Sequence, residues 1–153
     1  MATTAQLDPS SYLDQEAFSD VTIKIGDRSI KCHKLILCHN SDYFKMICAP
    51  GSRFVETRSN IIELKDDNPQ AAEAMLRYTY NLRYDDLGSP QQQTPKFHFD
   101  VCVVAEKYLL PALKQQALSG LQRLVNSHNK AQLSRYKPSS TRRRDHHRDQ
   151  TAG

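Results

Sequence analysis

The chain has 153 residues, which is the length of about one domain. It is 39% hydrophobic and 25% charged, with a mean hydropathy of −0.65, an ordinary composition for a globular protein. No run approaches eighteen apolar residues, which excludes a membrane-spanning helix. The first residues carry neither a basic start nor an apolar run, so we expect no secretory signal.

The net charge of +4 is concentrated at the C-terminal end. Residues 134–153 carry six basic and two acidic side chains, whereas residues 1–133 carry fifteen of each. Residues 134–153 include one aromatic residue and no aliphatic residue larger than Ala. They therefore cannot bury enough apolar surface to offset the chain entropy that is lost when a segment becomes ordered. We predict a largely flexible N-terminal segment over 1–18, a folded domain over 19–127 and a basic disordered tail over 128–153.

Three short strands are predicted in the first half of the chain. Residues 21–25 and 28–32 alternate apolar and polar side chains, and Gly26-Asp27 between them is typical of a hairpin turn. Residues 60–64 form the third strand. The side chains expected to face the core from the hairpin are Val21, Ile23, Ile25, Ile30 and Cys32.

Helices are predicted around and after these strands. Ser41 is a candidate N-cap, and Asn68-Pro69 is a clear helix start. The polar segment 84–95 is expected to be a mobile loop. The expected helices are 33–39, 42–48, 69–82, 99–110 and one that begins at 111 and reaches about 125. The predicted fold class is therefore α+β, a small three-stranded sheet covered by a cluster of α-helices.

The segment from Ser19 to about Val125 resembles the BTB/POZ domain. The motifs that carry the resemblance are Ser19-Asp20-Val21, His33-Lys34-Leu35-Ile36-Leu37, Ser41-Asp42-Tyr43-Phe44-Lys45-Met46, Ile62-Glu63-Leu64, Ala74-Met75-Leu76-Arg77-Tyr78-Thr79-Tyr80 and Ala105-Glu106-Lys107-Tyr108. The resemblance depends on their order and spacing together. Two features look like the fungal branch of the family: the polar insertion before the later helices, and the close packing of Leu37-Cys38-His39-Asn40-Ser41 before Tyr43-Phe44. Nothing after Val125 resembles a kelch, zinc-finger or MATH domain, so we expect a stand-alone BTB module.

The four cysteines suggest two chemical hypotheses, and we favour neither. Cys32-His33 and Cys38-His39 could be interpreted as zinc ligands, but no CxxC or HxxxH spacing accompanies them. A Cys–His nucleophile pair would need a third orienting group, and no nucleophile elbow or glycine-rich phosphate loop is visible. We expect no metal, no cofactor and no enzymatic activity, with Cys32, Cys48 and Cys102 as small core residues.

The resemblance implies a charged pair near a dimer interface. In the family, an acidic and a basic residue at the positions of Asp20 and Lys34 pair in a buried pocket. The alternative is that Asp20 caps a turn and Lys34 is solvated. If the pair is buried, removing one of its two charges would lower the free energy of unfolding by roughly 3–5 kcal/mol.

The resemblance also implies a cullin-binding surface. Phe54-Val55-Glu56 matches the hydrophobic-X-Glu motif with which cullin-binding BTB domains engage the N-terminal region of cullin-3. Tyr43, Met46 and Tyr108 match family positions at or near that surface, as does Phe44, for which we favour a core position. The alternative is that Phe54 packs on its own helix and Glu56 is solvated.

These patterns favour a non-enzymatic protein-interaction module in the cytoplasm, the nucleus or both. By resemblance it self-associates, as a homodimer or with another BTB chain, and serves as an adaptor for a cullin-3 ubiquitin ligase. The alternatives are an oligomerisation scaffold or transcription-related protein without a cullin contact, and a basic-tailed nucleic-acid binder, which is disfavoured. Arg142-Arg143-Arg144 is either a nuclear-import or phosphate-binding patch or part of a solvated tail.

Overall fold

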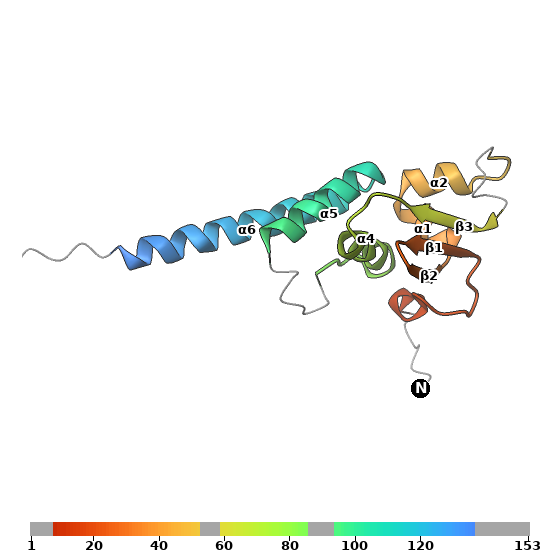
Figure 1. The fold of residues 1–153 in the computed structure, drawn as a ribbon, viewed down its shortest axis with the longest axis horizontal. Helices are drawn as coiled ribbons and strands as arrows, with labels where there is room; N and C mark the ends of the chain where they lie inside the picture. The colour runs from red at the N-terminus through yellow and green to blue at the C-terminus, as the bar shows by residue number, and fades with distance from the viewer. Residues whose placement is uncertain (1–7, 53–58, 86–93, 137–153) are drawn as a thin grey trace, which may run out of the picture.

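The computed structural model describes residues 8–52, 59–85 and 94–136. It confirms the α+β class, with three strands on one side of the molecule and two long helices on the other (Figure 1). The elements in chain order are η1 (Pro9–Tyr12), β1 (Val21–Ile25), β2 (Arg28–Cys32), α1 (Lys34–Asn40), α2 (Asp42–Cys48), β3 (Ile61–Leu64), α4 (Pro69–Asn81), α5 (Pro95–Lys107) and α6 (Pro111–Arg135).

The sheet has the order β2-β1-β3, with β1 in the centre. Strand β1 pairs antiparallel with β2, where Ile23 lies opposite Ile30, and parallel with β3, where Ile23 lies beside Ile62. Gly26 in the hairpin turn has a φ of +56°, a conformation that glycine adopts without a steric penalty. All five hairpin residues predicted to face the core are buried.

Helices α1 and α2 form the connection between β2 and β3. Ser41 separates them and has the predicted capping role, because its hydroxyl oxygen accepts the N–H of Phe44 at 3.2 Å. The same hydroxyl donates to the carbonyl of Tyr108 at 2.7 Å. One buried side chain therefore joins the start of α2 to the end of α5.

Helix α4 lies between the sheet and the pair formed by α5 and α6 (Figure 1). Its predicted start is confirmed, since the Asn68 side chain accepts the N–H groups of Gln70 and Ala71 at 3.0 and 3.1 Å. Leu82 ends it in the left-handed conformation, with a φ of +58°. Five side chains on one face of the helix are buried: Ala72, Met75, Leu76, Thr79 and Tyr80.

The segment before α5 differs from the prediction. The helix begins at Pro95 rather than 99, because Thr94 caps it by accepting the N–H of Phe97 at 3.2 Å. Tyr84, placed by the sequence at the start of a mobile loop, is buried, and its hydroxyl lies 2.7 Å from Nδ1 of His98. Residues 86–93 of the predicted loop lie outside the described residues.

Helix α6 also differs from the prediction, because it continues to Arg135. Residues 128–135, predicted as the start of the disordered tail, are helical and exposed. The prediction weighed only whether the segment could bury apolar surface, but extending a helix that is already nucleated needs no such burial. Residues 137–153 of the predicted tail lie outside the described residues. Within the described part, the helices are too short or too polar to cross a membrane.

Candidate functional site

A surface cavity of about 550 Å³ lies where β3, the start of α2 and the end of α5 meet. We call it the β3–α5 cavity. Aromatic, charged and apolar side chains contribute to its wall, which is a mixture suited to contact with another protein rather than to one small ligand. The lining residues are Tyr43, Ser59, Ile61, Glu63, Lys65, Asp66, Lys107 and Tyr108.

Three aromatic rings make this part of the surface rigid. Tyr43 meets Tyr108 edge to face, with ring centroids 4.9 Å apart and planes at 86°. Phe44 stacks on Tyr108 at 5.9 Å, with planes at 4°. Phe44 is fully buried, which confirms the core position favoured from the sequence, and Tyr43 remains partly exposed. Tyr108 therefore fixes the ring of Tyr43 at the edge of the cavity.

A carboxylate buried beneath the cavity holds Tyr108 in turn. The Tyr108 hydroxyl donates to Oδ2 of Asp67 at 2.5 Å, and Nζ of Lys107 donates to the same oxygen at 2.9 Å. The Asp67 side chain is 4% exposed and that of Lys107 is 45% exposed, so the carboxylate is buried while the ammonium side of the pair remains in contact with water. Burial, followed by the bond to Asp67, raises the pKa of Tyr108 well above its usual value. The phenol is therefore neutral and remains a donor to Asp67 at physiological pH.

The structure brings together part of the predicted cullin-binding set. Tyr43 and Met46 lie on α2, and Met46 is 55% exposed. Tyr108, which the resemblance places at or near the cullin-binding surface, lines the β3–α5 cavity but is only 2% exposed, and its ring positions that of Tyr43. Its assignment to that surface stays a prediction. Phe54 and Glu56 lie outside the described residues.

The buried charged pair predicted for Asp20 and Lys34 is not formed. Asp20 is exposed, and its carboxylate accepts the backbone N–H of Lys34 at 2.7 Å. The ammonium group of Lys34 donates instead to Oδ1 of Asn60 at 2.6 Å. Asp20 accepts a free N–H at the start of α1. This role is close to the alternative that Asp20 caps a turn, but the solvated Lys34 of that alternative is replaced by the bond to Asn60. Removing the Asp20 carboxylate is therefore expected to lower the free energy of unfolding by about 1 kcal/mol, less than the loss of a buried ion pair would.

Sequence reasoning missed Asp67 and the role of Lys107. Asp67 immediately precedes the capping residue of α4, and Lys107 ends α5, forty positions along the chain. Lys107 belongs to the motif Ala105-Glu106-Lys107-Tyr108, but no pattern in the sequence pairs it with a particular carboxylate. Their contact depends on the end of α5 lying beside the segment that follows β3, where Nζ of Lys107 also donates to the Lys65 carbonyl at 2.8 Å.

A second exposed surface surrounds α1. Leu35 on this helix is 82% exposed. Leu35 also lines a largely apolar cavity of about 420 Å³. We call this cavity and the exposed side chain of Leu35 the α1 face. The other lining residues are Pro9, Ile36, His39, Asn40, Thr79, Tyr80 and Leu82.

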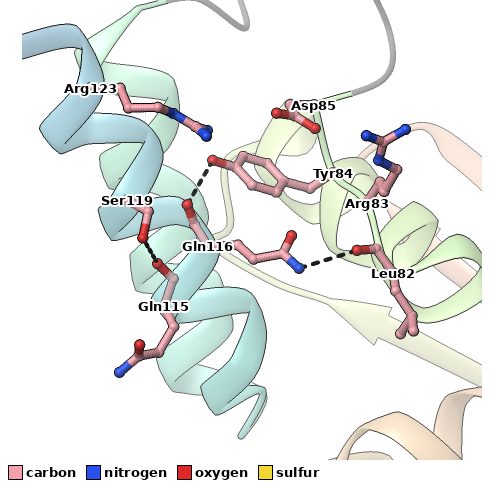
Figure 2. A pocket seen from close by; sticks show the side chains of 8 residues that line it. All are labelled: Leu82, Arg83, Tyr84, Asp85, Gln115, Gln116, Ser119 and Arg123. Atoms are coloured by element: carbon pink, nitrogen blue, oxygen red, sulfur yellow. Dashed lines mark hydrogen bonds between the residues drawn. The ribbon is translucent and has the colours of Figure 1, made fainter.

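A third, polar cavity of about 390 Å³ lies between the end of α4 and the middle of α6 (Figure 2). Some of its polar groups bond one another: the Tyr84 hydroxyl donates to the Gln116 carbonyl at 3.3 Å, and the Gln116 amide donates to the Leu82 carbonyl at 3.3 Å. Burial raises the pKa of Tyr84 to about 12 and lowers the pKa of His98 behind it. These bonds hold the end of α4 against α6, so we interpret the groups around the cavity as structural rather than catalytic.

The cysteines show no reactive or metal-binding arrangement in the part of the chain that the structure describes. Among those residues no three His, Cys, Asp or Glu side chains gather in a group that could hold a metal ion. Cys32 and Cys102 are buried, while Cys38 and Cys48 are partly buried. Burial raises the pKa of Cys32 to about 12 and that of Cys48 to about 11, so both are protonated thiols at neutral pH.

Known proteins are similar to this chain in sequence, and a solved structure is similar to it in fold. Rabankyrin-5 of Mus musculus is 31% identical over 116 residues, which cover 76% of this chain and 9% of that protein. Kelch-like protein 40a of Danio rerio is 32% identical over 110 residues, covering 72% of this chain and 16% of the relative. This chain thus spans less than a fifth of the length of either relative.

A solved structure, the BTB domain of zebrafish PATZ1, superposes with a TM-score of 0.53 at 17% identity, covering 69% of this chain and 77% of that one. This likeness supports the fold. The model of the BTB/POZ domain family matches residues 10–123, which is most of the chain. The chain therefore belongs to the BTB/POZ family and is a protein-interaction module.

Proposed function

We propose that this module is a non-enzymatic adaptor that binds the N-terminal region of a cullin-3 type ubiquitin ligase scaffold. The observation that supports the proposal is the exposed side chain of Met46 on the same helix as Tyr43, whose ring is fixed at the β3–α5 cavity. The motif Phe54-Val55-Glu56 belongs to the short segment between Ser52 and Ser59, and Ser59 lines that cavity.

The chemistry of this surface suits a protein partner. Binding energy at interfaces is concentrated in a few apolar and aromatic anchors surrounded by polar groups that exclude water. Met46 and Tyr43 provide such anchors, and Glu63, Lys65 and Lys107 provide charged groups around the cavity. Because Tyr108 and Asp67 already fix the ring of Tyr43, little side-chain entropy would be lost there on binding.

Calorimetric titration with a purified cullin-3 N-terminal region tests this proposal. We expect Met46→Lys, and separately the double variant Phe54→Ala with Glu56→Ala, to weaken binding about tenfold or more, which corresponds to about 1.4 kcal/mol. Val103→Lys is the matched control, because Val103 is 49% exposed on α5 and does not line the cavity. Absence of binding by the wild-type chain, or equal affinities for all four proteins, would contradict the proposal.

A second candidate function is self-association through the α1 face, as an oligomerisation scaffold. The observation that favours it is the exposure of Leu35 beside a largely apolar cavity. We expect Leu35→Glu to convert the chain from dimer to monomer in light scattering, while Leu133→Glu, at a similarly exposed position on α6, leaves the mass unchanged. A wild-type chain that is monomeric at about 100 μM would remove this candidate.

A further inference from the structure

A further cavity, of about 610 Å³, lies where the end of α5 is followed by the start of α6. We call it the α5–α6 cavity. Its wall is largely apolar, and two of its apolar side chains are partly exposed: Leu109, in the turn between the helices, is 43% exposed, and Leu118 on α6 is 47% exposed. Asp42, the first residue of α2, also lines it. Two large apolar side chains therefore meet water at one hollow of the surface.

The α5–α6 cavity adjoins the β3–α5 cavity. Tyr43 and Tyr108 line the β3–α5 cavity, while the residues next to them in the chain, Asp42 and Leu109, line the α5–α6 cavity. The hydrogen bond from the Ser41 hydroxyl to the Tyr108 carbonyl holds these two pairs of residues close together. Figure 1 shows the turn after α5 next to α2. Stable interfaces bury about 800 Å² on each partner, so a protein bound at the β3–α5 cavity is expected to extend over both cavities.

Leu109 occupies a backbone position that favours glycine. Its φ is +53°, and two hydrogen bonds typical of a helix end surround it: Leu110 N–H to the Ala105 carbonyl at 2.8 Å, and Leu109 N–H to the Glu106 carbonyl at 3.3 Å. Leucine is strained in this left-handed conformation, whereas glycine adopts it freely. Packing within the chain buries only part of the Leu109 side chain, and a contact with a partner would bury the rest.

The charges around the α5–α6 cavity favour a basic group on the partner. Glu106 is paired with Lys114, so these two charges offset each other. The carboxylate of Asp42 is exposed and has no hydrogen bond or ion pair within the part of the chain that the structure describes. One negative charge without a side-chain partner therefore lies beside the apolar wall. It complements a lysine or arginine located next to an apolar side chain.

We propose that the α5–α6 cavity is a second anchor point for the cullin-3 N-terminal region, and that it takes an apolar side chain of the cullin with a basic residue beside it. This inference rests on the proposed function, because the same partner covers both cavities. Leu109 and Leu118 pack around the apolar side chain, and Asp42 faces the basic one. Anchors of this kind, held in a pocket and surrounded by polar groups, supply most of the binding energy at interfaces.

Calorimetric titration of the full chain with a purified cullin-3 N-terminal region tests the inference. We expect Leu118→Glu to weaken binding about tenfold or more, because it places a charge in the apolar wall. The matched control is Val125→Glu, which makes the same change in charge at a 44% exposed position of the same helix, outside the cavity. It should weaken binding less than about threefold. Asp42→Asn should weaken binding about threefold and reduce its dependence on salt.

Leu109→Gly separates a role in binding from a role in the fold. We expect this variant to weaken cullin binding about fivefold. Its midpoint of thermal unfolding should equal or exceed that of the wild type, since glycine removes the left-handed strain. A side chain that served only the fold would give the reverse result, a lower midpoint with unchanged binding, and this result would overturn the inference.

Further outcomes distinguish this inference from the proposed function. No binding by the wild-type chain would overturn both. Weaker binding by Met46→Lys, with wild-type affinity in Leu118→Glu and Leu109→Gly, would overturn only the inference, as would equal affinities of Leu118→Glu and Val125→Glu. Unchanged cullin binding by a Leu118→Glu chain whose mass in light scattering is lower than that of the wild type would assign the cavity to contacts between copies. Circular dichroism checks the fold of each variant, and if Leu118→Glu does not fold, Leu109→Gly decides.

Discussion

The two halves of helix α6 have different sequences and opposite surroundings. The first half carries apolar residues at short intervals, whereas after Val125 the next apolar residue is Ala131. In the first half Leu113, Ala117 and Gly120 pack against the domain, while the residues from Val125 to Tyr136 are exposed. The buried side chains belong to the part of the helix that lies beside α5 and Tyr84, and the polar composition of the distal part matches its exposure.

Gly120 shows how close the packed half comes to its neighbours. A Cβ atom at this position would lie 2.6 Å from the Tyr84 hydroxyl and 2.7 Å from the ring of His98. Both side chains are buried and hydrogen-bonded to each other, so they have little freedom to move. The absence of a side chain is what allows α6 to approach the joint between α4 and α5.

The largest expected contrast comes from truncating one leucine in each half. We expect Leu113→Ala to lower the free energy of unfolding by about 3 kcal/mol, since it leaves a cavity among buried side chains. Leu133→Ala should change it by less than about 0.5 kcal/mol, because Leu133 is exposed. Urea denaturation measures both. Similar losses in the two variants would show that the distal half is packed in solution.

Adding volume to the two halves should give a smaller contrast. Gly120→Val is expected to lower the free energy of unfolding by about 2 kcal/mol, because the new side chain collides with Tyr84 and His98. Ala131→Val, on the exposed half, should cost about 0.5 kcal/mol through helix propensity alone. The midpoints of thermal unfolding report both effects. A Gly120→Val protein as stable as the wild type would mean that Tyr84 and His98 can rearrange.

The joint beside Gly120 should also respond to pH. Burial lowers the pKa of His98 in the folded chain, so the unfolded chain binds the proton more readily. Stability contributed by neutral His98 is therefore complete above the ordinary histidine value and declines as the pH falls below it. Urea titrations at pH 7 and pH 5 should show a larger loss for the wild type than for His98→Asn. Equal losses would assign the pH dependence to other groups.

The smallest expected effect concerns the backbone of the exposed half. Asn129→Gly should reduce the helical signal in circular dichroism but change the free energy of global unfolding by less than about 0.5 kcal/mol. Its counterpart Ala117→Gly, in the packed half, should cost about 1 kcal/mol or more. If the two glycine variants lower global stability equally, the halves of α6 unfold as one unit.

The sequence predicted those elements whose signals are local. The hairpin around Gly26, the cap at Ser41 and the start of α4 at Asn68 each depend on a few neighbouring residues, and all three are confirmed. The extension of α6 was missed because its helix is nucleated elsewhere, in the half that packs on α5. Thr94-Pro95, another local start signal, was overlooked within a polar segment.

The candidate site was harder to predict because its contacts join distant parts of the chain. Tyr43 and Met46 were identified through resemblance, but the burial of Tyr108 depends on Asp67 and Phe44 packing around it. For Asp20 the sequence left open an ion pair with Lys34 and a capping role, and the structure gives it the backbone N–H of Lys34. Sequence alone does not distinguish a side chain that binds an ammonium group from one that binds an amide.

The strand order has a consequence for the path of folding. Strand β1 pairs with β2 across a two-residue turn. Pairing of this local kind is fast, since isolated hairpins form in about 1–10 μs. Its other neighbour, β3, joins it only after α1, α2 and the chain that follows them have been brought back to the sheet, since Thr22 pairs with Ile61. Closing that long loop lowers the chain entropy before any contact between β1 and β3 can offset the loss. The hairpin is therefore expected to form early, and the β3 edge, which carries the surface beside Tyr43, to complete late.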